Sequence, residues 1–192
     1  FDSISQKVKE DAVLRIGDWV ADHGIDADGS YRAGRDLLLG VLPRELEPFD
    51  RDANPQISAV NWVSVLGDGV LPIQGPPGTG KSFTAAKMIL SLLQEGKKVG
   101  ITALSHKVIR GLLDKVMQAA SEAGLDIQCV QKVSESSELK VQGLEETNSN
   151  PRVLQLLTDG EVQLAAATSF LWAREEFFET LDVLFVDEAG QL

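Results

Sequence analysis

The chain has 192 residues, a formal net charge of −11, 43% hydrophobic residues and one cysteine, Cys129. This composition supports a sizeable core, and the length suits one large domain with additional segments. A single cysteine excludes an internal disulfide and a cysteine-rich zinc site, and we expect it to be buried core filler. No apolar run is long enough to cross a bilayer, and the polar start lacks a signal-peptide pattern, so we expect a cytoplasmic protein.

Charge is unevenly distributed along the chain. Residues 81–118 contain seven basic and two acidic residues, whereas residues 121–181 contain four basic and eleven acidic residues. An acidic protein can still bind nucleic acid along a local basic path, because the phosphates contact only that path. The overall balance of charge by itself gives no support for such a partner.

The first 52 residues predict two helices and no recognisable chemistry. Asp2 or Ser3 can cap a helix whose apolar residues recur at helical spacing as far as Val20. Residues 23–29 predict a loop, after which Ser30 can cap a second helix over 31–39. We interpret residues 1–52 as a helical linker packed on the domain that follows.

A third helix is predicted to begin at Asn54-Pro55, with the proline at a position where its missing N–H costs nothing. Gln56 lies on its first turn. A glutamine amide donates and accepts at once, so it could pair with the edge of an adenine, or it could be an ordinary surface residue.

A phosphate-binding loop is predicted between residues 74 and 82. The apolar residues 70–73 predict a strand, the glycine-rich loop follows, and residues 83–90 predict a helix. Gly75, Gly80, Lys81 and Ser82 match the pattern G-x-x-x-x-G-K-[ST]. Glycines let the backbone amides converge on a polyphosphate at the positive end of the helix. Lys81 would reach the β- and γ-phosphates and Ser82 would bind Mg²⁺; the alternative is a glycine-rich turn with a lysine by chance.

The next segment predicts a strand over 99–104 and a helix over 106–120. Ser105 lies between them, followed by His106 and Lys107, at the carboxyl edge of the expected parallel sheet. A hydroxyl and a lysine at a helix amino terminus can hold a phosphate. They can equally be an N-cap and a solvated first turn, and the spacing does not decide between these two interpretations.

The following segment predicts two more strands separated by an insertion. Residues 127–133 predict a strand, whereas the polar composition of 134–150 predicts a mobile insertion. Pro151 begins a short helix, and residues 162–167 predict a strand that ends at Thr168 and Ser169. Those two hydroxyls could contact phosphates or cap the helix expected over 170–178.

The apolar residues 183–186 predict a strand that ends in Asp187 and Glu188. An acidic pair at a strand tip, combined with a phosphate loop, is typical of a phosphate-loop NTPase. Asp187 would hold Mg²⁺ through water, and Glu188 would orient and deprotonate the attacking water.

Taken together, these motifs resemble the first half of a superfamily 1 helicase. The loop Gly75-Pro76-Pro77-Gly78-Thr79-Gly80-Lys81-Ser82 and the ending Asp187-Glu188-Ala189-Gly190-Gln191 are similar to the branch containing the nonsense-mediated-decay helicase. Residues 105–109 and 129–133 further resemble bacterial fusions of a RecB-like nuclease to such a helicase. The resemblance implies an α/β RecA-like P-loop domain over residues 53–192, after the helical segment 1–52.

The resemblance also implies roles for individual residues, with ATP and Mg²⁺ as cofactors. Gln56 would recognise adenine, and Gln191 would couple the γ-phosphate to domain movement. Lys81, Asp187, Glu188 and Gln191 would be catalytic, and Ser82 and Asp187 would hold the metal. The nucleotide-binding residues would be Gln56, Gly75, Pro76, Pro77, Gly78, Thr79, Gly80, Lys81, Ser82 and Phe83. The nucleic-acid contacts would be Ser105, His106, Lys107, Thr168 and Ser169.

Family members translocate on single strands, in this branch generally 5′ to 3′, and continue into a further strand motif and a second RecA-like domain that carries arginine fingers. We therefore expect a fragment that binds ATP but hydrolyses it slowly and unwinds nothing. The further strand would lie between the phosphate-loop strand and the Asp-Glu strand, so the sheet is expected to be gapped, swapped or completed by another chain. The expected partners are single-stranded DNA, favoured over RNA, the second domain and a fused nuclease domain.

Two other classes of function remain open. One is a AAA+ or similar ATPase acting on a protein partner, because the Gly-Pro-Pro-Gly-Thr-Gly-Lys loop occurs there too. The Gln56 helix, the Ala-x-Gln ending and the long separation between Lys81 and Asp187 disfavour it. The other is a nucleotide-gated binding module without catalysis.

Overall fold

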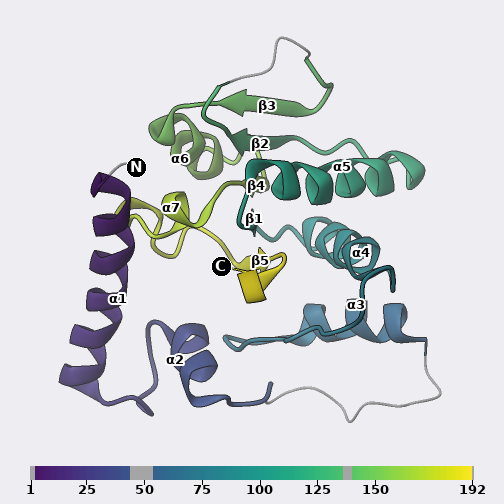
Figure 1. The fold of residues 1–192 in the computed structure, drawn as a ribbon. Helices are drawn as coiled ribbons and strands as arrows, with labels where there is room; N and C mark the ends of the chain where they lie inside the picture. Colours follow the sequence, from purple (N-terminus) through teal and green to yellow (C-terminus); the bar gives the residue numbers. More distant parts are fainter. Residues whose placement is uncertain (1–2, 44–53, 136–139, 192) are drawn as a thin grey trace. The chain divides into compact units, whose positions relative to one another are not determined.

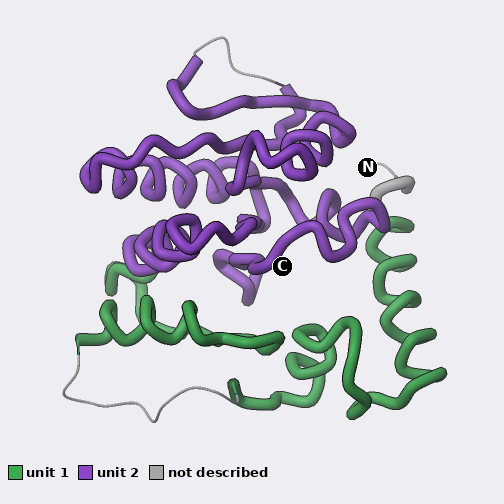
Figure 2. Tube along the Cα trace, turned by 180° about the vertical axis from the view of Figure 1, so that it is seen from behind, with its two compact units in different colours: residues 1–81 green, residues 82–192 purple. Residues whose placement is uncertain are grey.

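The computed structural model describes residues 3–43, 54–135 and 140–191. The chain forms two compact units, Phe1–Lys81 and Ser82–Leu192 (Figure 2). Within the described ranges, no helix combines the length and apolar character that a membrane crossing requires.

The second unit is built on a parallel sheet of five strands. The strands are β1 (Val99–Thr102), β2 (Cys129–Lys132), β3 (Leu144–Thr147), β4 (Leu164–Ala166) and β5 (Val183–Val186). Their order across the sheet is β3-β2-β4-β1-β5, and every adjacent pair is parallel (Figure 1). Parallel strands need crossover connections, so their carboxyl ends meet at one edge and their amino ends at the other.

Helices cover both faces of this sheet. Figure 1 shows α4 (Lys81–Gln94) and α5 (His106–Glu122) on one side of the strands, and α6 (Asn150–Thr158) and α7 (Ser169–Trp172) on the other. Val130 and Ala165 pack against Val153, Leu156 and Leu157 of α6 in one buried apolar cluster. Strands buried on both faces carry near-continuous apolar runs, which explains sequences such as Leu-Ala-Ala in β4.

Gly100 in β1 lies so close to three neighbouring side chains that they would have to shift to make room for a Cβ atom. A Cβ atom placed there would clash with the side chain of Leu181 and lie 2.9 Å from Leu184 Cδ1. The indole of Trp172 lies just beyond, at 3.4 Å. The absence of a side chain therefore lets these three residues close over the centre of the sheet.

Strand β5 lies at the edge of the sheet, with Leu184 and Val186 exposed. Residues 70–73, predicted as the strand that leads into the phosphate loop, form no strand in the structure. That prediction is wrong because a strand depends on a paired neighbour, and an apolar run does not supply one.

The structure also corrects the insertion predicted over 134–150, where residues 136–139 lie outside the description. Residues 144–147 form β3, which pairs with β2 along its whole length. Two ion pairs tie this strand to the helices on either face: Arg110 of α5 with Glu146 at 2.6 Å, and Arg152 of α6 with Glu145 at 2.9 Å. The acidic residues that suggested a polar insertion are thus part of the sheet.

The first unit contains α1 (Ser3–His23), α2 (Arg32–Leu39) and α3 (Pro55–Val65). Helix α3 begins as predicted, with the Asn54 side chain accepting a hydrogen bond from the Gln56 amide at 2.9 Å. The predicted Ser30 cap of α2 is wrong. The N-cap is Tyr31, in the left-handed conformation and with no side-chain capping bond.

A buried arginine accounts for that difference. Arg35 donates hydrogen bonds to the carbonyl oxygens of Ile25 and Ala27, both at 2.6 Å, and of Gly29 at 3.1 Å. Its guanidinium also lies 4.3 Å from the centre of the Trp19 ring. The side chain of Arg35, rather than a serine cap, therefore organises the turn before α2.

Candidate nucleotide-binding and strand-binding sites

The glycine-rich loop before α4 has a backbone that only glycine adopts easily. Gly78 and Gly80 have φ angles of 80° and 84°. A Cβ on Gly75 would lie 2.9 Å from Thr79 Oγ1, which itself donates a hydrogen bond to the Pro76 carbonyl at 2.8 Å. The loop is therefore closed on itself in a tight turn, as a phosphate cradle requires.

Lys81 folds back over this loop. Its Nζ donates hydrogen bonds to the carbonyl oxygens of Gly75 at 2.6 Å and Pro76 at 2.9 Å. Pro76 and Pro77 have no amide N–H, so beyond Gly75 the amide donors of the loop begin at Gly78. This donor set of one ammonium, loop amides and a hydroxyl fits a polyphosphate.

The first turn of α4 carries the remaining loop residues. Ser82 is partly buried, while Phe83 is exposed, with Lys87 Nζ 4.6 Å from the centre of its ring. Gln56 lies half-buried on the first turn of α3. Gln56, the loop and Lys81 belong to the first unit, whereas Ser82 and Phe83 belong to the second.

The acidic pair follows β5 at the carboxyl edge of the sheet. The Asp187 amide donates to the Thr102 carbonyl at 2.9 Å, which extends the pairing with β1 by one residue. Glu188 has a φ of 53°, and its amide donates to Asp187 Oδ1 at 3.0 Å. The amide of Gln191, in the short helix Ala189–Gln191, donates to the Glu188 carbonyl at 2.8 Å. The chain therefore reverses sharply at the strand tip, with the Glu188 side chain exposed.

The structure brings the predicted residues together in two groups. Gly75, Pro76, Thr79 and Lys81 contact one another in the loop, and Asp187, Glu188 and Gln191 form one turn. A hydroxyl and a carboxylate, from Ser82 and Asp187, are the oxygen ligands that Mg²⁺ prefers. That Ser82 and Asp187 bind one and the same metal ion remains a prediction.

The predicted strand-contacting residues lie at the carboxyl ends of β1 and β4. Ser105 is the N-cap of α5, and its Oγ accepts a hydrogen bond from the Val108 amide at 3.3 Å. Thr168 occupies the N-cap position of α7, but its side chain makes no capping hydrogen bond, and Ser169 begins that helix. Lys107 is exposed on the first turn of α5. Helix capping therefore explains the presence of a hydroxyl at Ser105, whereas it does not explain the one at Thr168.

His106 has a more enclosed setting than a solvated first turn. Burial, followed by the charge of Lys132, holds the pKa of His106 below its ordinary value of 6.5. The buried Gln131 of β2 donates from Nε2 to the His106 carbonyl at 3.3 Å. Sequence reasoning missed Gln131, although a polar residue inside the apolar run 127–133 was a signal for it.

Trp172 was also missed, and it fixes α7 to the sheet. Its Nε1 lies 3.3 Å from the Ile101 carbonyl and 3.2 Å from the Ala167 carbonyl, at the carboxyl ends of β1 and β4. The indole thereby holds the Thr168-Ser169 turn at this edge of the sheet.

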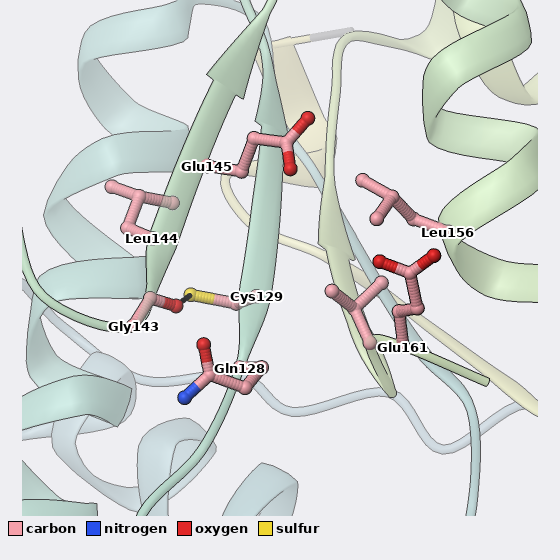
Figure 3. Close-up of a pocket in the computed structure, with 8 residues that line it drawn as sticks. Gln128, Cys129, Gly143, Leu144, Glu145, Leu156 and Glu161 are labelled. Atoms are coloured by element: carbon pink, nitrogen blue, oxygen red, sulfur yellow. Dashed lines mark hydrogen bonds between the residues drawn. The ribbon is translucent and has the colours of Figure 1, made fainter.

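A pocket lies at the opposite edge, among the amino ends of β2, β3 and β4 (Figure 3). Its volume is about 470 Å³. Cys129 Sγ donates to the Gly143 carbonyl at 3.2 Å, and burial raises the pKa of the thiol to about 12. The interpretation of Cys129 as buried core is confirmed. The lining residues are Gln128, Cys129, Gly143, Leu144, Glu145, Leu156, Glu161 and Val162.

Comparison with known proteins agrees with this architecture at the level of the family. No curated protein matches the chain. A family model described as an AAA domain matches residues 53–192, which is more than half of the chain. The five-stranded parallel sheet flanked by helices is consistent with a RecA-like P-loop NTPase domain, in which nucleotide and a divalent metal are generally bound. The chain therefore belongs to the AAA domain family of P-loop NTPases.

Proposed function

We propose that this chain is the ATP-binding part of a superfamily 1 helicase, a motor that moves along single-stranded nucleic acid. The observation that carries the proposal is the combination, in one AAA-family chain, of Lys81 folded over a glycine loop and Asp187-Glu188 at the tip of β5. These are the two halves of a phosphate-loop NTPase site.

Each half has a defined role in the proposed reaction. Lys81 would exchange its two carbonyl partners for phosphate oxygens. Ser82 and Asp187 would hold Mg²⁺, which would neutralise charge on the triphosphate when bound. The exposed carboxylate of Glu188 orients the attacking water and accepts its proton. Gln191, one turn after Glu188, would transmit the state of the γ-phosphate to the rest of the motor.

The strand-binding side of the proposal rests on Ser105, His106, Lys107, Thr168 and Ser169. The Thr168 hydroxyl makes no capping bond, and Lys107 is exposed at a helix amino terminus, so both can meet phosphate oxygens. Single-stranded DNA rather than RNA, and movement from 5′ to 3′, follow from the helicase resemblance alone.

A second candidate is an ATPase that acts on a protein partner, because the family match is to an AAA domain. The two candidates differ in what stimulates hydrolysis by the full-length protein. Single-stranded DNA should increase ATP turnover in a helicase, whereas it should have no effect on an ATPase that remodels proteins.

The nucleotide site can be tested in the 192-residue chain by titrating a fluorescent ATP analogue with Mg²⁺. Nucleotide binding is the direct readout, since the resemblance places the catalytic arginines on another domain and predicts slow turnover. Lys81→Ala should weaken binding roughly ten- to a hundredfold, because a charge-assisted contact to phosphate is lost. Lys97→Ala, in the exposed turn after α4, is the matched control and should bind as the wild type does. Equal affinity of wild type and Lys81→Ala would contradict the proposal.

A further inference from the structure

The carboxyl edge of the sheet places a lysine beside the predicted strand-contacting residues. Gln131 in β2 is paired with Ala166 in β4, which is paired with Ile101 in β1. The next residue of each strand therefore forms a row at this edge, with Lys132 next to the segment that leads into Thr168.

Lys132 lies on the α7 face of the sheet. Val130, two residues earlier, packs in the same buried cluster as Leu171 of α7, and side chains two apart in a strand share a face. Arg174 follows α7 directly, and its amide donates to the Leu171 carbonyl at 3.1 Å. Strand β2 and helix α7 thus bring a lysine and an arginine to one place.

The electrostatics agree with this placement. Burial, followed by the positive charge of Arg174, lowers the pKa of Lys132, and Lys132 in turn lowers the pKa of His106. Like charges held close together and partly buried cost free energy unless an anion offsets them. Within this group Glu176 pairs with Arg174 at 3.3 Å, but that pair is exposed and contributes little.

Two buried polar atoms without partners lie at the same edge of the sheet, on its α5 face, across β2 from the side chain of Lys132. Gln131 is only 2% exposed, and its Oε1 has no hydrogen-bond partner among the described residues. The buried Nδ1 of His106 also lacks a partner in the part of the chain that the structure describes. Buried polar groups are normally satisfied, so these two atoms show that the carboxyl edge has room for a polar partner, which a water or a ligand can supply.

We propose that Lys132 and Arg174 bind the backbone phosphates of a single nucleic-acid strand and extend the path of Ser105, Lys107 and Thr168. This inference rests on the proposed function and adds two residues to it. Arginine offers paired donors that match a phosphate, and lysine offers a compact point charge. Neither side chain needs a base edge, so binding through them is independent of sequence.

The test uses a fluorescently labelled oligothymidylate and fluorescence anisotropy over a series of salt concentrations. The double variant Lys132→Gln/Arg174→Gln should bind at least about tenfold more weakly at low salt. Each lost phosphate contact reduces the slope of log affinity against log salt by about 0.7, so the double variant should lose about 1.4. The charge-preserving variant Lys132→Arg should retain both affinity and slope.

Lys115→Gln is the control for charge, because it removes one positive charge from the same unit, half of what the double variant removes. Lys115 is exposed on α5, about 14 Å along the helix axis from His106. This variant should bind the strand with wild-type affinity and slope, which separates a local contact from an effect of net charge.

Three outcomes would overturn the inference. The double variant could bind with the affinity and slope of the wild type, the Lys115→Gln control could lose as much as the double variant, or polyglutamate could displace the strand as effectively as unlabelled oligothymidylate does. Failure of the proposed function would be seen in other measurements. The wild-type protein would not bind the strand, or its affinity for nucleotide would not depend on Lys81.

Discussion

The two edges of the parallel sheet differ in how completely their polar groups are satisfied. At the carboxyl edge, Thr102 Oγ1, His106 Nδ1 and Gln131 Oε1 are buried and have no partner among the described residues. At the amino edge, Cys129 donates to Gly143, and Arg152 pairs with both Glu145 and Glu161. Both edges belong to the same strands and the same core, so the general architecture does not explain why their polar groups are satisfied to different extents.

This difference separates structure from function within one unit. A buried polar atom without a partner costs stability, and a fold tolerates that cost where a ligand meets the atom. The carboxyl edge also carries Asp187, Glu188, Lys107 and Thr168. At the amino-edge pocket, by contrast, Glu145 and Glu161 are paired with Arg152, and Gln128 is hydrogen-bonded to Asp126. This contrast supports the proposal that the carboxyl edge is the binding surface, whereas the ion pairs at the amino edge stabilise the sheet.

The largest expected effect comes from a substitution in β1, the strand next to the edge strand β5. Gly100→Val would place a branched side chain against Leu181, Leu184 and Trp172. We expect the free energy of unfolding to fall by about 3 kcal/mol, measured by urea denaturation. Gly111→Ala is the control, because a Cβ at Gly111 of α5 meets no atom within 4 Å. That variant should gain up to about 1 kcal/mol, as expected for alanine in a helix.

A smaller effect compares the same substitution at each edge. Gln131→Met keeps the volume and removes the unpartnered buried Oε1 together with the Nε2 donor to the His106 carbonyl, so we expect the free energy of unfolding to rise by less than about 1 kcal/mol. Gln128→Met, at the exposed side chain beside the amino-edge pocket, should change stability by less than about 0.5 kcal/mol. Equal effects of the two substitutions in urea denaturation would remove the contrast between the edges.

Stability at the carboxyl edge should also depend on the titration of His106. Its pKa in the folded state lies below the ordinary 6.5, so the unfolded chain binds more protons as the pH falls through that value. The contribution of His106 is therefore complete above pH 6.5 and decreases as the pH falls toward the lower folded-state pKa. Urea denaturation between about pH 7.5 and 5.5 should show a steeper loss of stability in wild type than in His106→Asn. Identical slopes would show that His106 is solvated like a free histidine.

The smallest expected effect lies at the amino edge. A hydrogen bond from Arg152 lowers the pKa of Glu145, so this carboxylate stabilises the fold above its ordinary pKa near 4.5. That contribution is lost as the pH falls through the lower folded-state pKa. Arg152→Gln should therefore make the melting temperature less sensitive to pH below about pH 5, with nucleotide binding unchanged at neutral pH. An unaltered acid dependence would contradict the role given to this ion pair.

Local signals in the sequence predicted much of this fold. Short-range patterns placed several elements close to where the structure has them: the helix that begins at Asn54-Pro55, the Ser105 cap with the helix after it, and strands β1, β2, β4 and β5. Each depends on a side chain and its immediate neighbours, or on an apolar run.

The features that were missed depend on residues far apart in the chain. β3 looks polar because Glu145 and Glu146 are matched by arginines of α6 and α5, and no local pattern reveals such pairs. Residues 70–73 have the apolar run of a strand without its paired neighbour. Gln131 is a buried polar residue whose hydrogen-bond partner, the His106 carbonyl, lies 25 residues earlier in the chain, so composition alone places it at the surface.

For the candidate site, sequence motifs predicted which residues take part but not their present contacts. The pattern indicated Lys81, yet only the structure shows its ammonium held by the carbonyls of Gly75 and Pro76. Lys132 and Arg174 belong to no motif, and they emerge only from the register of β2 with β4 and from the position of α7.

The most direct test of the account is a double-mutant cycle between Ser82→Ala and Asp187→Asn, read out as affinity for a fluorescent ATP analogue with Mg²⁺. If both side chains hold one metal ion, each single variant should lose most of the magnesium-dependent affinity, and the double variant should lose little more than either. Losses that add fully, or nucleotide affinity that neither substitution changes, would contradict a shared magnesium–triphosphate site.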